Sequence, residues 1–459
     1  MTRQKRGPME APHYFFCGVG GSGMMPLAMI VAARGSRVSG SDRSLDQGRV
    51  AEKFAALERQ GIGLFAQDGS GVAAGQIFVA SAAVEEMVPD VRAAKRLGLA
   101  RLSRADLLAQ LFNTSAERIA VGGTSGKSTV TGMIGWILDK AGLDPTVMNG
   151  AVMKNYVRPD APFASARVGA GRAFVSEVDE SDGSIALYAP DIAVLNNVAL
   201  DHKSMEELRR LFGDFVGRAR IAIVNADNAE ALALAGANAR TFGFGDGADL
   251  RGRDLVERPD GVDFAANGVP VSLNVPGRHN AANALAALAA AEAAGIPLPE
   301  GAAALASFAG LRRRLDLVGS RHGVTVIDDF GHNPDKIGAT LDTLHAFPGR
   351  LLVMFQPHGY GPLKLMGKEL AETFRTKLGP GDRLFLPDPA YYGGTVDRSE
   401  GSEELAKAIG PCTEYLAERA AIGSRLAAEA RPGDRILIMG ARDDTLSSFA
   451  AELLERLDG

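Results

Sequence analysis

The sequence predicts an α/β protein of three domains: a Rossmann-like N-terminal domain, a central P-loop ATPase-type domain with a mostly parallel sheet, and a C-terminal Rossmann-like α/β domain. Three segments, which begin near His13, Arg118 and Val324, each open with an apolar or β-branched run, followed by a turn of small residues and a helical pattern. Glycine-rich turns follow the first strand in two of these segments. A chain of 459 residues with 46% apolar residues can form several hydrophobic cores.

The domain boundaries are expected near residues 115 and 315, which gives the ranges 1–115, 116–315 and 316–459. Strand–helix alternation of this kind predicts mostly parallel sheets, with ligands at the carboxyl ends of the strands. Between Phe242 and Val275, short alternating runs with several glycines predict small antiparallel strands in the central domain. The alanine-rich stretch from Asn280 to Gly295 predicts a helix, because alanine is the best helix former.

Composition and charge limit the class of partner and the compartment. A net charge of -5 with 6% aromatic residues disfavours nucleic-acid binding and leaves small molecules as the expected substrates. The chain is expected to be a monomer or a homodimer. No apolar stretch is long enough to span a membrane, and the first residues lack the apolar core of a signal peptide. Cys17 and Cys412 have no metal-ligand or redox spacing. We therefore expect a cytoplasmic protein.

A glycine-rich loop is the strongest local signal in the chain. Gly122–Ser128 reads GGTSGKS and lies between the strand RIAV and a long helical pattern. Backbone N–H groups of such a turn bind phosphates, Lys127 neutralises their oxygens, and the Ser128 hydroxyl can bind Mg²⁺. The loop is one residue shorter than the usual Walker loop, because Val121 and not glycine stands five residues before Gly126. Its flanking strand and helix nevertheless predict a nucleotide site.

Acidic and histidine side chains follow later strands of the same domain. The strand AFVSEV brings Glu177 to its carboxyl end, where a carboxylate beside the γ-phosphate suits a Mg²⁺ ion. Asp179, Glu180 and Asp182 follow in an acidic turn. His202 follows the strand IAVL and the residues NNVALD. A lone histidine is more often structural than catalytic, and only this position after a central strand makes it a candidate.

The first domain carries a second glycine-rich turn. Gly18–Gly23 follows a strand and opens a helix, and Asp42 ends the next strand. This is the outline of a dinucleotide fingerprint, in which the glycines let a pyrophosphate approach and the acid binds a ribose hydroxyl. Two classes of function fit: a nicotinamide-dependent dehydrogenase, or a ligase that binds the diphosphate of a UDP-sugar here. The separate phosphate loop favours the ligase.

Motifs spread over nearly the whole chain resemble those of the Mur ligase family, most closely its alanine-adding and muropeptide-recycling branches. In chain order they read GVGGSGM, VSGSD, SRADLLAQL, GGTSGKST, SEVDESDGS, NNVALDH, GRHNAANALAA, LRRRLD, DDFGHNP and FQPH. The resemblance implies an ATP-dependent ligase that activates a carboxylate as an acyl phosphate and joins it to an amine. It also implies ATP and Mg²⁺ as cofactors, and a UDP-N-acetylmuramate-like acid as substrate in peptidoglycan synthesis or recycling.

The resemblance further implies roles for residues of the central domain. Lys127, Glu177 and His202 would be catalytic, and Ser128 would bind magnesium together with Glu177 and His202. Asn280, in the H-N-x-x-N segment, would face the adenine of ATP, or else merely cap its helix. The residues expected around the phosphates of ATP are Gly123, Thr124, Ser125, Gly126, Lys127, Ser128 and Thr129.

The outer domains receive implied roles as well. Arg314, counted as catalytic, would reach the ATP phosphates, or else belong to a solvated linker run. Asp329 would bind the ATP ribose, or else be an exposed acid at a strand end. His332, also counted as catalytic, would lie near the incoming amine. In the first domain, the nucleotide sugar would contact Gly20, Gly21, Ser22, Gly23, Asp42 and Ser81.

The chain departs from the alanine-adding branch where the substrates should bind. Gln67–Asp68 stands in place of a Gly-His pair and Ala82 in place of a serine. The alternative is therefore a Mur-type ligase whose acid substrate is not a cell-wall precursor but a cofactor precursor or a poly-amino acid. Gly359–Pro362 lacks the arginines that hold the carboxylate of a free amino acid, so the amine stays open, with Lys364 or Arg398 as substitutes. A nucleotide-binding relative without catalysis is the remaining alternative, and the intact phosphate-loop and acidic motifs argue against it.

Overall fold

A computed structural model describes residues 11–81, 84–200, 203–391, 398, 401–441 and 443–457. Three β-sheets within these residues confirm the three-domain α/β architecture. The chain divides into two compact units, so the expected boundaries near residues 115 and 315 stay predictions. No described helix is both long and apolar enough to cross a membrane. The first unit consists of Met1–Leu255, Asp263–Leu273 and His279–Ala309, and the second of Val256–Val262, Asn274–Arg278 and Gly310–Gly459.

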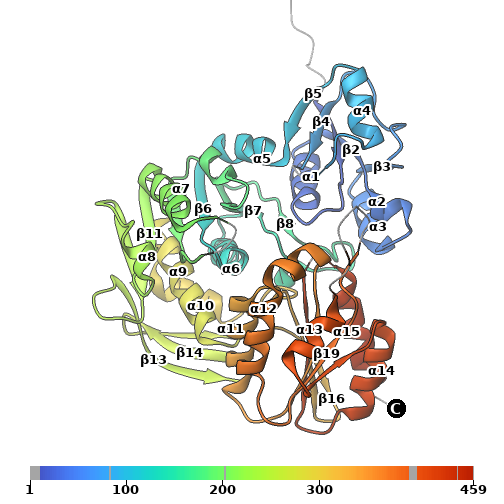
Figure 1. Ribbon diagram of the computed structural model, residues 1–459. Helices are drawn as coiled ribbons and strands as arrows, with labels where there is room; N and C mark the ends of the chain where they lie inside the picture. Colours follow the sequence, from blue (N-terminus) through green and yellow to red (C-terminus); the bar gives the residue numbers. More distant parts are fainter. Residues whose placement is uncertain are drawn as a thin grey trace, which may run out of the picture. The chain divides into compact units, whose positions relative to one another are not determined.

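The first sheet lies in the blue part of the ribbon (Figure 1) and has five parallel strands. Its strands are β1 (His13–Cys17), β2 (Arg37–Ser41), β3 (Gly63–Phe65), β4 (Ile77–Ala80) and β5 (Ala100–Ser103). The helices beside it are α1 (Met24–Ala33), α2 (Arg43–Asp46), α3 (Ala51–Arg59), α4 (Pro89–Arg96) and α5 (Arg104–Asn113). In the spatial order β3-β2-β1-β4-β5, the chain adds strands to one side of β1 and then to the other, so the topological switch point lies between β1 and β4. A ligand is therefore expected outside the carboxyl ends of those two strands.

Alternate residues of β1 enter different cores, which is why helices cover both faces of this sheet. Phe16 belongs to the core that includes α1, whereas Phe15 and Cys17 belong to the core that includes α4. Successive side chains of a strand point to opposite faces, so the continuous apolar run of β1 has a partner on each side. Helix α5 begins at a capping box, in which Ser103 and Asp106 each accept the other's backbone N–H.

The second sheet, of ten strands, has the order β15-β14-β13-β12-β11-β10-β6-β9-β7-β8. Its strands are β6 (Glu117–Gly122), β7 (Thr146–Met148), β8 (Ala166–Arg167), β9 (Ala173–Glu177), β10 (Ile192–Leu195), β11 (Ile221–Asn225), β12 (Ala239–Gly243), β13 (Leu250–Arg258), β14 (Gly261–Ala266) and β15 (Val269–Leu273). Its helices are α6 (Lys127–Lys140), α7 (Met205–Arg218), α8 (Ala229–Leu232), α9 (Arg278–Ala293) and α10 (Leu298–Leu305), with short 3-10 turns at Lys154–Tyr156 and Ser184–Leu187.

The middle of this sheet brings separate motifs to one edge. Strand β6 lies between β9 and β10 and runs parallel to both. Ile119, Val175 and Val194, one from each strand, are 0% exposed, as expected of strands covered on both faces. Because the carboxyl ends of parallel strands meet at one edge, the phosphate loop after β6 lies beside Glu177 at the end of β9 and Asn196 after β10.

The strands expected between residues 242 and 275 are present, but they continue the large sheet instead of standing apart from it. Asn267 and Gly268 connect β14 to β15 with φ values of 45° and 85°. Two left-handed residues of this kind make the tight turn of a hairpin. The predicted alanine-rich helix is confirmed as α9, and most alanines within it are buried, where their small side chains let neighbouring elements approach closely.

The third sheet has the order β16-β17-β21-β18-β19-β20, and only its edge pair β16–β17 is antiparallel. Its strands are β16 (Asp316–Arg321), β17 (Val324–Asp329), β18 (Leu351–Gln356), β19 (Arg383–Leu386), β20 (Thr413–Tyr415) and β21 (Arg435–Gly440). Along β18, Leu351 and Val353 pack with α11 (Pro334–His345), α12 (Tyr360–Lys377) and α13 (Ser402–Ile409). Leu352 and Met354 pack with α14 (Arg419–Glu429) and α15 (Thr445–Arg456), so this domain is also doubly wound.

Candidate active site

The phosphate loop has a conformation that only glycine can adopt at two positions. Gly123 has φ 135° and Gly126 has φ 80°. A Cβ atom on Gly126 would collide with the side-chain amides of Asn196 and Asn283. Helix α6 begins directly after the loop at Lys127, so its unpaired N–H groups face the turn. The local structure therefore forms the anion-binding cradle that the sequence predicts.

Asn197 holds this loop in place from the neighbouring strand end. Its Oδ1 accepts a hydrogen bond from Thr124 Oγ1 and another from the backbone N–H of Ser125, both at 2.9 Å. The backbone N–H of Thr124 also donates to the Asn197 carbonyl at 3.2 Å. Three bonds from one residue fix the loop before any ligand arrives, which reduces the entropy lost on binding.

Ser128 and Glu177 form an oxygen pair at the start of α6. Ser128 Oγ donates to Glu177 Oε2 at 2.6 Å, and Asn149 Nδ2 donates to the Ser128 carbonyl at 2.9 Å. A hydroxyl and a carboxylate at the mouth of a phosphate loop are the hard oxygen ligands that Mg²⁺ prefers. Among the described residues, no three or more histidine, cysteine or acidic side chains are arranged so that they could hold a metal ion by themselves. His202, the expected further ligand, lies outside the described residues, so its role stays a prediction.

Lys127 is paired with an acid that the sequence did not single out for it. Its ammonium donates to Glu180 Oε2 at 2.7 Å and to the Gly123 carbonyl at 2.8 Å. The Glu180 side chain is only 4% exposed. Burial raises the pKa of Glu180, and Lys127 opposes that rise. The cation expected to bind phosphate thus lies at the loop, in contact with a buried carboxylate.

A chain of asparagine side chains runs from the loop to α9. Asn196 Nδ2 donates to Asn283 Oδ1 at 2.9 Å, and Asn283 Nδ2 donates to Asn280 Oδ1 at 3.1 Å. Asn280 is 4% exposed within the first turn of α9, and its contact with the adenine of ATP stays a prediction. The Oδ1 atom of Asn196 is buried without a partner within the described chain, which leaves an acceptor for a ligand near the loop.

The first-domain glycine turn is held by Asp42. The backbone N–H of Gly20 donates to Asp42 Oδ2 at 2.9 Å, and the N–H of Ser44 donates to Oδ1 at 2.8 Å. Gly21 and Ser22 are exposed at the tip of the turn. Ser81 follows β4 directly, so the predicted contacts occupy neighbouring strand ends at the switch point. Their binding of a nucleotide sugar stays a prediction.

Arg104 lies beside the same glycine turn. Gly23 lies against Arg104, since a Cβ atom there would come within 3.0 Å of Arg104 Cδ. The Arg104 guanidinium also pairs with Asp182 at 3.3 Å, so it connects the glycine turn of the first domain to the acidic turn of the central one. Asp68 accepts the N–H of Ser70 in its own loop at 2.9 Å. Ala82 lies outside the described residues.

In the second unit, Asp329 is buried and not exposed at a strand end. It is 7% exposed, and its carboxylate accepts the backbone N–H groups of Leu315 and Gly331, both at 2.8 Å. Arg313 and Leu315 have φ values of 61° and 47°, a left-handed conformation that costs side-chain-bearing residues energy. Asp329 therefore fixes the strained segment that contains the predicted Arg314. Its contact with a ribose stays a prediction.

Arg314 and His332 both lie against one aromatic ring, that of Phe330. The guanidinium of Arg314 is 4.4 Å from the centre of the Phe330 ring, and the His332 ring is 5.4 Å from it. His332 Nδ1 lies 3.0 Å from the Phe330 carbonyl, which fits an Nδ1–H donor and an accepting Nε2. Burial, with nearby Lys336, lowers the pKa of His332 to about 3, so the imidazole is uncharged at neutral pH.

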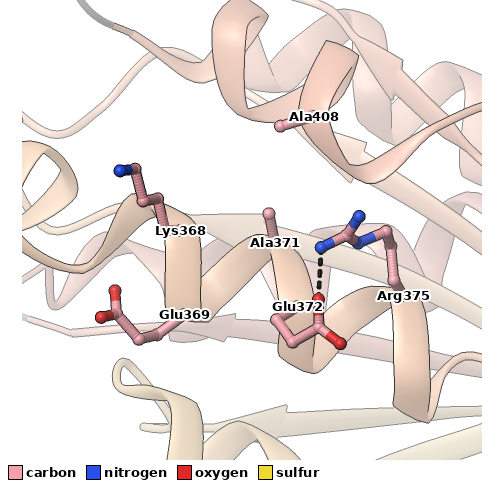
Figure 2. Close-up of a pocket in the computed structure, with 6 residues that line it drawn as sticks. All are labelled: Lys368, Glu369, Ala371, Glu372, Arg375 and Ala408. Atoms are coloured by element: carbon pink, nitrogen blue, oxygen red, sulfur yellow. Dashed lines mark hydrogen bonds and ion pairs between the residues drawn. The ribbon is translucent and has the colours of Figure 1, made fainter.

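The second unit also contains a surface groove and a cluster of two tyrosines with an arginine. A shallow groove between α12 and α13 is lined by Lys368, Glu369, Ala371, Glu372, Arg375 and Ala408, with Arg375 paired to Glu372 (Figure 2). None of the predicted site residues lines it. By contrast, Tyr360 and Tyr391 lie with ring centres 6.2 Å apart, and the Arg398 guanidinium is 4.8 Å from the centre of the Tyr391 ring. The rest of that loop, 392–397, lies outside the described residues.

The sequence alone did not reveal several contacts of the site. Glu180 was expected only as part of an acidic turn, and Asn149 and Arg104 were not expected to contribute. Their partners are distant in sequence, at separations of 53, 21 and 78 residues. The acidic turn was the one available signal for Glu180, and it did not show which of its acids binds Lys127.

Comparisons with known proteins agree with this geometry. The Mur ligase family catalytic domain matches residues 13–115, the Mur ligase middle domain 121–291, and the Mur ligase glutamate ligase domain 313–442. The chain is 36% identical to the UDP-N-acetylmuramate–L-alanine ligase of Streptomyces avermitilis, with 98% of each chain covered. It is 34% identical to the ligase of that name from Dinoroseobacter shibae, with 100% of each chain covered.

Solved structures show the same fold. The UDP-N-acetylmuramate–alanine ligase of Thermotoga maritima superposes with a TM-score of 0.81 at 22% identity, over 97% of this chain and 99% of that one. The murein peptide ligase of Psychrobacter arcticus superposes with a TM-score of 0.72 at 24% identity, over the same shares of the two chains. Full-length sequence matches, together with the phosphate loop and its carboxylates, show that the chain belongs to the Mur ligase family of ATP-dependent amide-forming ligases.

Proposed function

We propose that this ligase joins the carboxylate of a UDP-N-acetylmuramate-like acid to the amine of an amino acid or peptide, at the expense of ATP, in peptidoglycan synthesis or recycling. The observation that carries the proposal is the Ser128–Glu177 pair, 2.6 Å apart, at the mouth of a loop that also presents Lys127. The names of the full-length relatives support the choice of acid and make L-alanine the first amine to test. The cytoplasm is the proposed compartment.

The proposed reaction has two bond exchanges. A carboxylate oxygen of the acid attacks the γ-phosphorus of ATP, and ADP leaves with the electron pair of the broken P–O bond. The amine nitrogen then attacks the acyl carbon, and phosphate leaves with the electron pair and the former carboxylate oxygen, while the nitrogen loses a proton. The protein contributes mostly positioning and charge neutralisation to such phosphoryl transfer.

The residues of the central domain fit that task. Lys127 would neutralise phosphate oxygens, and the N–H groups of the loop and of α6 would bind them. Ser128 and Glu177 would hold Mg²⁺, which when bound supplies positive charge to the phosphate oxygens during transfer. The unpartnered Oδ1 of Asn196 and the glycine-only turn at Gly126 are consistent with a nucleotide in this cradle.

The first domain would hold the acid through its nucleotide part. The switch point between β1 and β4, with the glycine turn and Ser81 at its rim, is the expected position for a diphosphate. Asp68 does not argue for a different acid, because its carboxylate bonds to Ser70 within its own loop. Arg104, beside Gly23, adds a positive charge to this rim.

The amine would be bound by the second unit. An uncharged His332 would not repel an ammonium group, and its Nε2 could accept a hydrogen bond from the amine. The chain has glycines around Tyr360 where arginines are expected in the alanine-adding branch. Arg398, beside Tyr391, would supply the missing guanidinium for the carboxylate of the amine substrate. The flanking tyrosines suit a larger side chain than that of alanine.

The experiment that tests this function measures release of ADP and phosphate from Mg-ATP and UDP-N-acetylmuramate. L-Alanine, other amino acids and short muropeptides would be offered in turn, with Lys127→Ala as the control enzyme. We expect release that needs both the acid and one class of amine and is lost in Lys127→Ala. Release that is independent of the acid, or no release with any amine while ATP still binds, would contradict the proposed substrates.

A further inference from the structure

Glu180 makes a contact that the ligase reaction itself does not require. Its carboxylate lies 2.7 Å from the ammonium of Lys127, with the two side chains 4% and 20% exposed. Lys127 also donates to the Gly123 carbonyl at 2.8 Å. An ammonium has three donors, so two of them are used before a phosphate arrives. The cation that should bind the nucleotide is therefore already paired.

We propose that Glu180 is a positioning residue that holds Lys127 at the loop and competes with the nucleotide's terminal phosphates for its ammonium group. The inference rests on the proposed nucleotide site. A phosphate that approaches Lys127 must also approach the Glu180 carboxylate, and the repulsion between two anions is stronger in a buried site than in water. Nucleotide binding thus exchanges a protein carboxylate for a phosphate at Lys127.

The backbone around Glu180 cannot easily move away. Its carbonyl accepts the N–H of Gly183 at 3.1 Å, and Gly183 has φ 76°, so the segment closes into a tight turn. Asp179, the preceding residue, accepts both the N–H and the hydroxyl of Ser181 at 2.8 and 2.6 Å. Exchange of Lys127 between the carboxylate and a phosphate therefore involves rotation of the Glu180 or Lys127 side chain, with the backbone turn in place.

The charges around Glu180 have opposite effects on its carboxylate. Lys127 stabilises the ionised form, while Asp179 and burial destabilise it. Arg104 acts on the neighbouring Asp179 and pairs with Asp182 at the far end of the same turn. Lys127 is thus the principal counter-charge of Glu180, and their ion pair restrains both side chains.

The test measures equilibrium binding of Mg-ADP and of AMP to the full chain by calorimetry. Glu180→Gln keeps the size of the side chain and removes the competing charge. We expect the Kd for ADP to fall about tenfold, whereas the Kd for AMP, which has no phosphate at Lys127, stays the same. A merely structural role of Glu180 would change both affinities together or neither of them.

Asp182→Asn is the matched control, since it removes a charge from the same turn without touching Lys127, and its Kd for ADP should stay within about twofold of the wild type. Glu180→Ala serves as the second variant if Glu180→Gln does not fold. If both Glu180 variants bind ADP no more tightly than the wild type, while Lys127→Ala does not bind ADP, the proposed competition between Glu180 and the phosphate is refuted. Wild-type ADP binding that survives in Lys127→Ala would instead overturn the nucleotide site, and the competition with it.

Discussion

Ser128 Oγ lies 2.6 Å from Glu177 Oε2, although the two residues are 49 positions apart in the chain. Ser128 lies in the first turn of α6, the helix after β6, and Glu177 ends β9, and these two strands are hydrogen-bonded neighbours. The parallel register therefore creates the oxygen pair. Glycine at position 150 completes it, because any side chain there would collide with the Glu177 carboxylate.

Glu177→Gln should disable catalysis while leaving nucleotide binding largely intact. The amide has nearly the same size and can still accept the Ser128 hydrogen bond, but it removes the negative charge that a magnesium ion requires. We expect kcat/KM to fall by about 100-fold or more and the Mg²⁺ concentration for half-maximal rate to rise. Initial rates over a magnesium titration would measure both. An unchanged magnesium dependence would contradict the assignment of Glu177 as a metal ligand.

Gly150→Ala tests the same pair without altering any charge. The added methyl group would displace the Glu177 carboxylate, and a displacement of about 1 Å at a reacting centre can cost about 100-fold in rate. We expect a large loss of kcat with a nearly unchanged melting temperature. Gly217→Ala in α7 is the matched control, because nothing lies within 4 Å of the added atom. Equal activity of the two alanine variants would contradict the geometry.

Asp42→Ala should weaken binding of the acid and not of the nucleotide. The substitution leaves the N–H groups of Gly20 and Ser44 without their acceptor, which loosens the turn expected to face the diphosphate. Loss of one such hydrogen bond costs about 1–3 kcal/mol, so KM for the acid should rise about tenfold. Steady-state kinetics would give KM, and calorimetry the Kd for ADP. A rise in the Kd for ADP with an unchanged KM for the acid would contradict the proposal that the first domain binds the acid and the central domain binds the nucleotide.

Asp328 should make stability depend on pH. It is 1% exposed, and burial raises its pKa to about 6, while Arg313 and Ser447 oppose the rise. A carboxyl whose pKa is higher in the folded chain stabilises the fold when protonated, and this stabilisation is lost as pH rises through about 6. Relative to Asp328→Asn, the wild-type free energy of unfolding should fall between pH 4 and 7 by at most about 3 kcal/mol. Urea unfolding would measure it, and parallel curves would refute the assignment.

Local signals made much of the fold predictable. Apolar runs followed by turns of small residues identified β1, β6 and β17, and the alanine-rich stretch identified α9. The phosphate loop was predictable because its glycines and Lys127 are contiguous in sequence. The extent of the central sheet was not predictable. The sequence of β13 to β15 indicates a separate group of short strands, and only the pairing of β13 with β12 joins them to the large sheet.

Side-chain partners in the site were harder to predict for a physical reason. The acidic turn offers Asp179, Glu180 and Asp182 within a few residues, and tertiary packing alone decides that Glu180 bonds to Lys127. The sequence did not reveal that the Asp329 carboxylate also holds the backbone of Leu315. No sequence rule predicts a left-handed leucine, since such a conformation persists only where surrounding contacts impose it.

The central claim, activation of a carboxylate as an acyl phosphate, is tested most directly with an acid labelled with ¹⁸O in its carboxylate. One oxygen of that group becomes a phosphate oxygen in the first step and leaves with phosphate in the second. We therefore predict that each phosphate released during turnover of UDP-N-acetylmuramate with its amine carries one ¹⁸O atom, as measured by mass spectrometry. Unlabelled phosphate formed alongside amide product would contradict the account.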